Sequence, residues 1–79
     1  MSTLNRDKKT QIRVNAALDM IEQADGASAV RFATAYAIGY INALHDERRI
    51  SLDGAQLYRA DAHERRDRRL TALDVELGI

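Results

Sequence analysis

Apolar side chains recur at helical spacing in three stretches of the chain. In the first stretch, Val14, Met20 and Ile21 lie on one broad face of a helical wheel, and most charged side chains lie elsewhere. This pattern predicts an amphipathic helix over residues 5–24. We expect Gly26 to end it, because glycine accepts the left-handed backbone of a helix C-cap at little cost.

The second stretch, residues 29–47, is apolar around more than half of its circumference. A helix of this kind is typical of a central position, packed by neighbours on two sides. We expect Ser28 to cap its start. Aromatic residues recur at four-residue spacing along it and should pack in the core against an aromatic residue of the third stretch. The predicted core residues are Phe32, Tyr36, Tyr40, Leu44 and Tyr58.

The third stretch predicts a helix over residues 52–74. Ser51 is a good N-cap, and Ile50 before it can fold back on the helix as a hydrophobic staple. The apolar line of this helix is interrupted by Arg66 and Arg69.

Composition agrees with an all-helical chain, since the 79 residues include no proline and only four glycines. We expect a single domain over residues 1–79, either a three-helix bundle or a helical hairpin plus one helix. So short a chain has a small core and no cysteine for a disulfide, and we therefore expect it to self-associate, most simply as a homodimer.

The charges of the chain balance, with 12 basic and 12 acidic residues. A net charge of zero gives no overall field to attract nucleic acid or an anionic membrane. The N-terminal residues lack the apolar segment of a signal peptide, and the longest uncharged run, residues 32–44, is too short to span a bilayer. These features predict a soluble, cytoplasmic protein.

Catalytic and metal-binding patterns are not evident. His63 and Asp67 stand one helical turn apart, but a closed metal site needs about four ligands. There is no glycine-rich phosphate loop, and Ser51 is explained as a cap. We therefore expect no enzyme activity, no catalytic residues, no cofactor and no metal.

Arginines are concentrated between His63 and Arg69. Asp61 with Arg65, and Glu64 with Arg68, have the spacing of ion pairs within a helix. The arginines that interrupt the apolar line either cover hydrophobic surface with their stems or anchor a partner. Apolar residues outside the main helix faces suggest an interface. The predicted partner-binding residues are Arg59, Arg65, Arg66, Arg69, Ile38 and Leu57.

The segment Tyr36–Asp46, followed by Arg49-Ile50-Ser51, resembles a known group of sequences. It is similar to short helical proteins of unknown role from phages, prophages and plasmids of proteobacteria. Their pattern is an alanine-rich helix with Gly-Tyr and Ala-Leu, a charged turn, an isoleucine and a helix cap. The resemblance implies an accessory protein of a mobile element, and many of these bind and block one host protein, as anti-CRISPR proteins do.

Two functions follow as hypotheses. The first is a non-catalytic protein–protein interaction module that binds and inhibits or modulates a host protein complex. The alternative is a small DNA- or RNA-binding regulator, in which residues 51–59 begin the recognition helix of a helix-turn-helix. The zero net charge and Asp53 in the first turn of that helix argue against the alternative.

Overall fold

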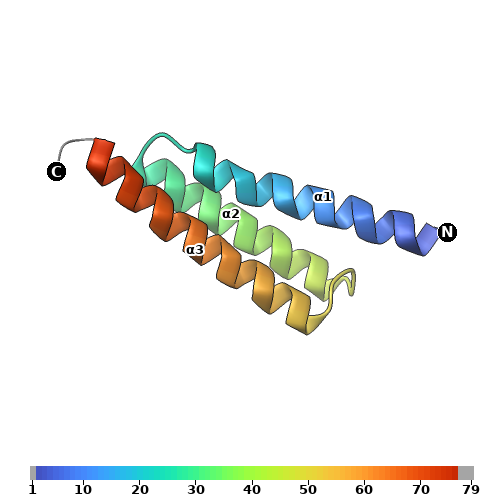
Figure 1. Ribbon diagram of the computed structural model, residues 1–79. Helices are drawn as coiled ribbons and strands as arrows, with labels where there is room; N and C mark the ends of the chain where they lie inside the picture. Colours follow the sequence, from blue (N-terminus) through green and yellow to red (C-terminus); the bar gives the residue numbers. More distant parts are fainter. Residues whose placement is uncertain (1, 77–79) are drawn as a thin grey trace.

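The computed structural model describes the backbone of residues 2–76 and the side chains of residues 8–75. Within these residues the chain forms three helices and no strand: α1 (Ser2–Gln23), α2 (Ala27–Asp46) and α3 (Leu52–Glu76). Consecutive helices run antiparallel, and each helix contacts the other two (Figure 1). The expected all-α fold is confirmed, and of its two forms the protein adopts the three-helix bundle.

The connection between α1 and α2 differs from the sequence prediction. Gly26 has an extended backbone (φ −159°) and is the N-cap of α2, so it is not a left-handed C-cap of α1. The Val30 amide donates to the Gly26 carbonyl at 2.9 Å, so the first turn of α2 begins ahead of Ser28. The capping roles predicted for Gly26 and Ser28 are therefore both wrong.

The start of α3 is as predicted. The Ser51 hydroxyl accepts a hydrogen bond from the Gly54 amide at 3.0 Å, which satisfies one of the free N–H groups of the first turn. Ile50 is half-buried and packs against the core.

A left-handed residue ends α2. The Arg49 amide donates to the Leu44 carbonyl at 2.8 Å and the Arg48 amide to the His45 carbonyl at 2.9 Å, which is the hydrogen-bond pattern of a Schellman motif. This motif places one residue in the left-handed region, and here that residue is Arg48, with a φ of 62°. Glycine is the residue that usually holds this position, because a Cβ is strained there.

We predict that Arg48→Gly stabilises the protein by about 0.5–1 kcal/mol, because it relieves the left-handed strain without removing a backbone hydrogen bond. Urea denaturation followed by far-UV circular dichroism would measure the change. Arg31→Gly, on the exposed side of α2, is the control, and it should destabilise the protein by about 1 kcal/mol. Equal losses in the two variants would contradict the capping role of residue 48.

The core lies along one narrow face of α2. α1 and α3 pack against this face, and α3 contributes only alanines to the fully buried set. The hydroxyl of the buried Thr34 donates to the Val30 carbonyl at 2.7 Å, so no polar group is left unsatisfied by its burial. The buried residues are Thr10, Val14, Ala17, Leu18 and Ile21 of α1, Val30, Ala33, Thr34, Ala37, Ile41 and Leu44 of α2, and Ala55 and Ala62 of α3.

The aromatic stripe of α2 lies largely outside this core. Phe32 is 72% exposed and Tyr36 is 50% exposed, so their assignment to the core is wrong. Leu44 is buried as predicted, while Tyr40 and Tyr58 are only half-buried against the core. The inward face of α2 includes small alanines, which let the three helices approach closely. Aromatic rings on that face would hold the helices apart, and they therefore lie outside it.

On α1, too, the buried and the exposed residues differ from those expected. Met20, expected on the inward face, is 46% exposed, whereas Leu18, which lies at the margin of that predicted face on a helical wheel, is fully buried. The inward face of α1 is therefore rotated from the predicted one, towards the side that meets both α2 and α3.

We predict that Leu18→Ala destabilises the protein by about 2–5 kcal/mol, because it opens a cavity where three helices meet. Leu57, which is 73% exposed on α3, gives a control with the same change of side chain. Leu57→Ala should alter the free energy of unfolding by less than about 0.5 kcal/mol. Thermal and urea unfolding would measure both, and comparable losses would mean that the described core is wrong.

Candidate protein-binding surface

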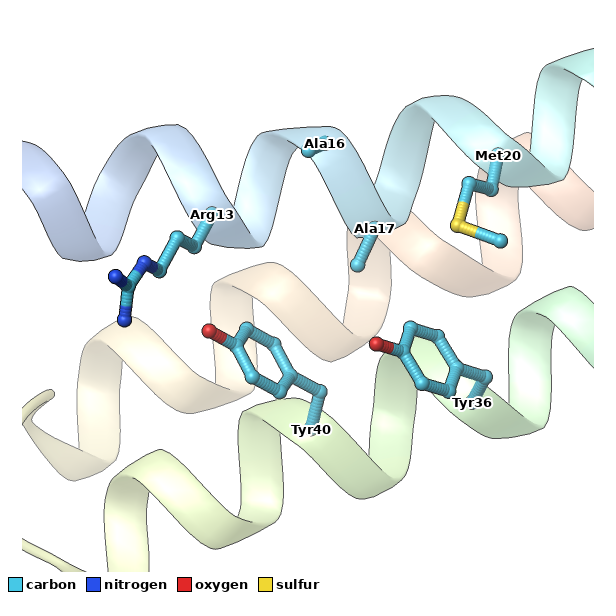
Figure 2. Close-up of a pocket in the computed structure, with 6 residues that line it drawn as sticks. All are labelled: Arg13, Ala16, Ala17, Met20, Tyr36 and Tyr40. Atoms are coloured by element: carbon cyan, nitrogen blue, oxygen red, sulfur yellow. The ribbon is translucent and has the colours of Figure 1, made fainter.

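An exposed apolar surface runs along the groove between α1 and α2. Two adjoining shallow depressions form it, and Met20 lines both. Tyr36 and Tyr40 line the first (Figure 2), and Phe32 lines the second. We call this surface the α1–α2 apolar face; it comprises Ala16, Met20, Ala24, Ala29, Phe32, Tyr36 and Tyr40.

The two tyrosines are ordered by each other. Their rings are stacked nearly parallel, with centroids 6.3 Å apart and an interplanar angle of 6°. Figure 2 shows both side chains projecting from α2 towards α1, with Met20 extending from α1 towards α2. Stacked rings have few accessible rotamers, so binding here requires little further ordering of side chains.

The α1–α2 apolar face exposes more area than single, scattered apolar residues on a surface do. Met20, Phe32 and Tyr36, with the exposures given above, together leave on the order of 350 Å² of side-chain surface in water. Contiguous apolar patches of roughly 300–600 Å² on small proteins often mark interaction sites. Among residues 8–75, Arg13 is the only charged side chain that lines either depression. The α1–α2 apolar face therefore has the chemistry of a surface that binds protein.

Gly39 adds an independent feature on the outer side of α2. It is exposed in the interior of the helix, and a Cβ placed there would meet no atom from outside its own stretch of helix within 4 Å. Glycine in a helix interior costs about 1 kcal/mol relative to alanine. No contact among the described residues accounts for this cost, whereas the close approach of another molecule would.

Arg65 joins α3 to α1. It donates to Asp19 at 2.9 Å and to Glu22 at 2.8 Å, both on α1, and to Asp61 at 3.1 Å on its own helix. Partial burial acts to lower the pKa of Arg65, but the hydrogen bonds and charges of these three carboxylates outweigh it and raise that pKa. The predicted pair of Asp61 with Arg65 is thus confirmed and is one part of a four-residue cluster.

The other arginines of the predicted partner-binding set also have partners within the chain. Arg59 donates to the Asn42 side chain at 2.8 Å, and Arg66 lies 3.0 Å from Asp67. Arg69 donates to the Ala24 carbonyl at 2.8 Å, where a cation is favourable because α1 ends there. Of the two arginines that interrupt the apolar line, Arg69 is thus explained by a contact between helices, whereas Arg66 pairs with its neighbour on α3.

The remaining predicted site residues lie on different sides of the bundle. Leu57 is exposed on α3, as expected for a surface residue. Ile38, expected to be an exposed apolar residue outside the main helix face, is instead half-buried against the core. Arg68 lies 3.9 Å from Glu22 of α1, instead of forming the ion pair predicted with Glu64. Among the described residues, no three potential metal-ligating side chains are grouped together.

Sequence reasoning missed the α1–α2 apolar face because it assigned the aromatic residues to the core. One signal could have located it: Gly39 falls between Tyr36 and Tyr40 in a helix that is otherwise rich in alanine. A glycine amid strong helix formers weakens the helix, so it draws attention to the side on which it lies. Its position beside the aromatics marks that side of the helix.

Comparison with known proteins found no matching family model, curated protein or solved structure. Across residues 2–76, none of the helices combines the length and the apolar character needed to cross a membrane.

We predict that Arg65→Ala destabilises the bundle by about 1–3 kcal/mol, because it leaves three carboxylates close together without their shared cation. Arg68→Ala is the matched control. The Arg68 side chain is 61% exposed whereas that of Arg65 is 18% exposed, so the control should cost less than about 0.5 kcal/mol. Denaturant unfolding would compare the two variants, and equal losses would contradict a structural role for the cluster.

Proposed function

We propose that this protein is a non-catalytic protein–protein interaction module that acts by contact of the α1–α2 apolar face with protein. The observation that carries the proposal is the exposure of Phe32, Tyr36 and Met20 on one continuous surface. Aromatic residues and methionine are enriched where proteins meet, and charged residues are depleted at the centre of such contacts. The pairing of Arg65 and Arg69 within the chain leaves this face as the surface best suited to binding.

The biological setting of the proposal comes from the resemblance of residues 36–51 to accessory proteins of phages and plasmids. On that ground we propose a cytoplasmic protein of a mobile element that binds and inhibits or modulates a host protein complex, in the manner of an anti-CRISPR protein. Contact with a large complex needs a rigid surface and no catalytic group, which agrees with a small bundle bearing ordered aromatic side chains.

The alternative function, DNA or RNA binding, draws no support from the arrangement of α2 and α3. A helix-turn-helix crosses its helices at about 90–120°. Here α2 and α3 run antiparallel, side by side along the bundle (Figure 1). Asp53 in the first turn of α3 also places negative charge where a recognition helix approaches DNA.

Photo-crosslinking in cells tests the proposed function. A benzophenone amino acid replaces Phe32 in one variant and Gln56, exposed on α3, in the control. We expect irradiation to give a covalent adduct between position 32 and protein, either another copy of this chain or a host protein, and much less adduct at position 56. Mass spectrometry of the adducts identifies the linked chain. Adducts at position 32 no more abundant than those at position 56 would contradict the proposal.

A further inference from the structure

The outer side of α2 carries two parallel rows of side chains. One row, the aromatic ridge, consists of Phe32, Tyr36 and Tyr40. The other, the small-residue groove, consists of Ala35, Gly39 and Ala43, all of which are exposed. Both rows advance by four residues, which is the spacing of the ridges and grooves by which helices most often pack on one another.

From this pattern we infer that the protein which covers the α1–α2 apolar face is a second copy of this chain, with the two α2 helices packed antiparallel about a two-fold axis. The inference rests on the proposed function and names the partner. In such a dimer the aromatic ridge of each copy fills the small-residue groove of the other.

The register of this packing follows from the positions of the large and small residues. When α2 is reversed about the point midway between Ala37 and Ile38, every member of the aromatic ridge falls opposite a member of the small-residue groove. Contacts across a two-fold axis are reciprocal: if one residue of the first copy meets a second residue of its partner, then that second residue of the first copy meets the first residue of the partner. The opposed pairs are Phe32 with the partner's Ala43, Tyr36 with the partner's Gly39, and Tyr40 with the partner's Ala35. A surface shaped for an unrelated protein has no reason to be complementary to itself.

The charges at the ends of α2 fit the same register. The N-terminus of α2 has no side-chain cap and no acidic residue in its first turn, so its partial positive charge is not offset there. Asp46 is exposed at the other end of the helix. In the antiparallel register, Asp46 falls opposite the partner's Ala29, in that first turn. A parallel arrangement would instead bring the two Asp46 carboxylates together.

The exposed apolar side chains supply much of the area that a specific dimer needs. The lower limit for specific interfaces is roughly 600 Å² per partner. Met20, Phe32 and Tyr36 already supply more than half of this, and Tyr40 with the exposed alanines of α1 and α2 adds to it. The dimer also accounts for the glycine at position 39, because the ring of the partner's Tyr36 would occupy the space that a side chain at this position would fill.

Such a dimer leaves α3 uncovered on both copies. The exposed Leu57 would then be presented twice on the surface of the dimer.

Sedimentation equilibrium of the purified full chain tests the inference. We expect the parent to be a dimer with a micromolar dissociation constant. Gly39→Leu should weaken association by about tenfold or more, because the leucine fills the groove. The monomer should melt no lower than the parent at low concentration, because a Cβ at this position meets no described atom outside the helix backbone and leucine favours the helix more than glycine does. Ala60→Leu, which adds bulk at an exposed site on α3, is the matched control and should leave the dissociation constant unchanged.

A double variant tests the register itself. Tyr36→Ala should weaken association alone, as Gly39→Leu does, whereas both changes in one chain again oppose a large residue to a small one and should recover at least part of the lost affinity. Gly39→Ala replaces Gly39→Leu if the larger change impairs folding, with weaker association expected. A dimer that is indifferent to position 39 overturns the inference, as does a double variant no tighter than the weaker single variant.

The outcomes for the two proposals are separable. A parent chain that stays monomeric at high micromolar concentration overturns the dimer. If position 32 still crosslinks to a host protein in cells, the proposed function stands while the dimer falls. If position 32 gives no adducts above the control, the proposed function falls as well.

Discussion

The close packing of α2 against both of its neighbours is the contact on which the rest of the bundle depends. Ala33 and Ala37 make the inward face of this helix narrow, and Val30, Ile41 and Leu44 fill the space around them. Three helices can meet over such a face only if no large ring intervenes. The aromatic residues of α2 are therefore displaced outwards, and the feature that makes the core compact also creates the exposed surface.

The seam between α1 and α3 depends on charged groups as much as on apolar contact. α3 contributes only Ala55 and Ala62 to the fully buried core, and its larger apolar side chains Tyr58, Leu70 and Leu73 are only partly buried. Arg65 and Arg69 compensate by reaching across to two side chains and a backbone carbonyl of the α1 segment. Multiply hydrogen-bonded, partly buried arginines stabilise such a seam more than exposed ion pairs do.

The existence and order of the helices could be predicted from the sequence, because apolar residues recur at helical spacing and the chain has no proline and few glycines. The cap at Ser51 was equally predictable, since it depends on residues adjacent in the chain. The inward face of α2 was not predictable in this way. Helical periodicity locates a buried face by contrast with a polar one, and α2 offers apolar residues on two sides, so only the fit to α1 and α3 selects between them.

The hydrogen-bond and ion-pair partners of the arginines could not all be predicted from the sequence, for a related reason. Arg65 pairs with Asp61 one turn away, which helical spacing predicts, but also with Asp19 and Glu22, far away in the chain. Such contacts follow from the docking of whole helices. The exposed surface differs in this respect, because the position of Gly39 between two tyrosines can be read from the sequence alone.

The internal pairing of the α3 arginines has a kinetic consequence. With 12 charges of each sign, and with Arg65 and Arg69 bound to carboxylates or to a carbonyl, the protein has no net charge to guide an approaching molecule. Encounters then proceed at the unsteered rate of roughly 10⁵–10⁶ M⁻¹ s⁻¹ and vary little with ionic strength. The affinity of a complex is then set mainly by its dissociation rate, that is, by how slowly the apolar contact separates.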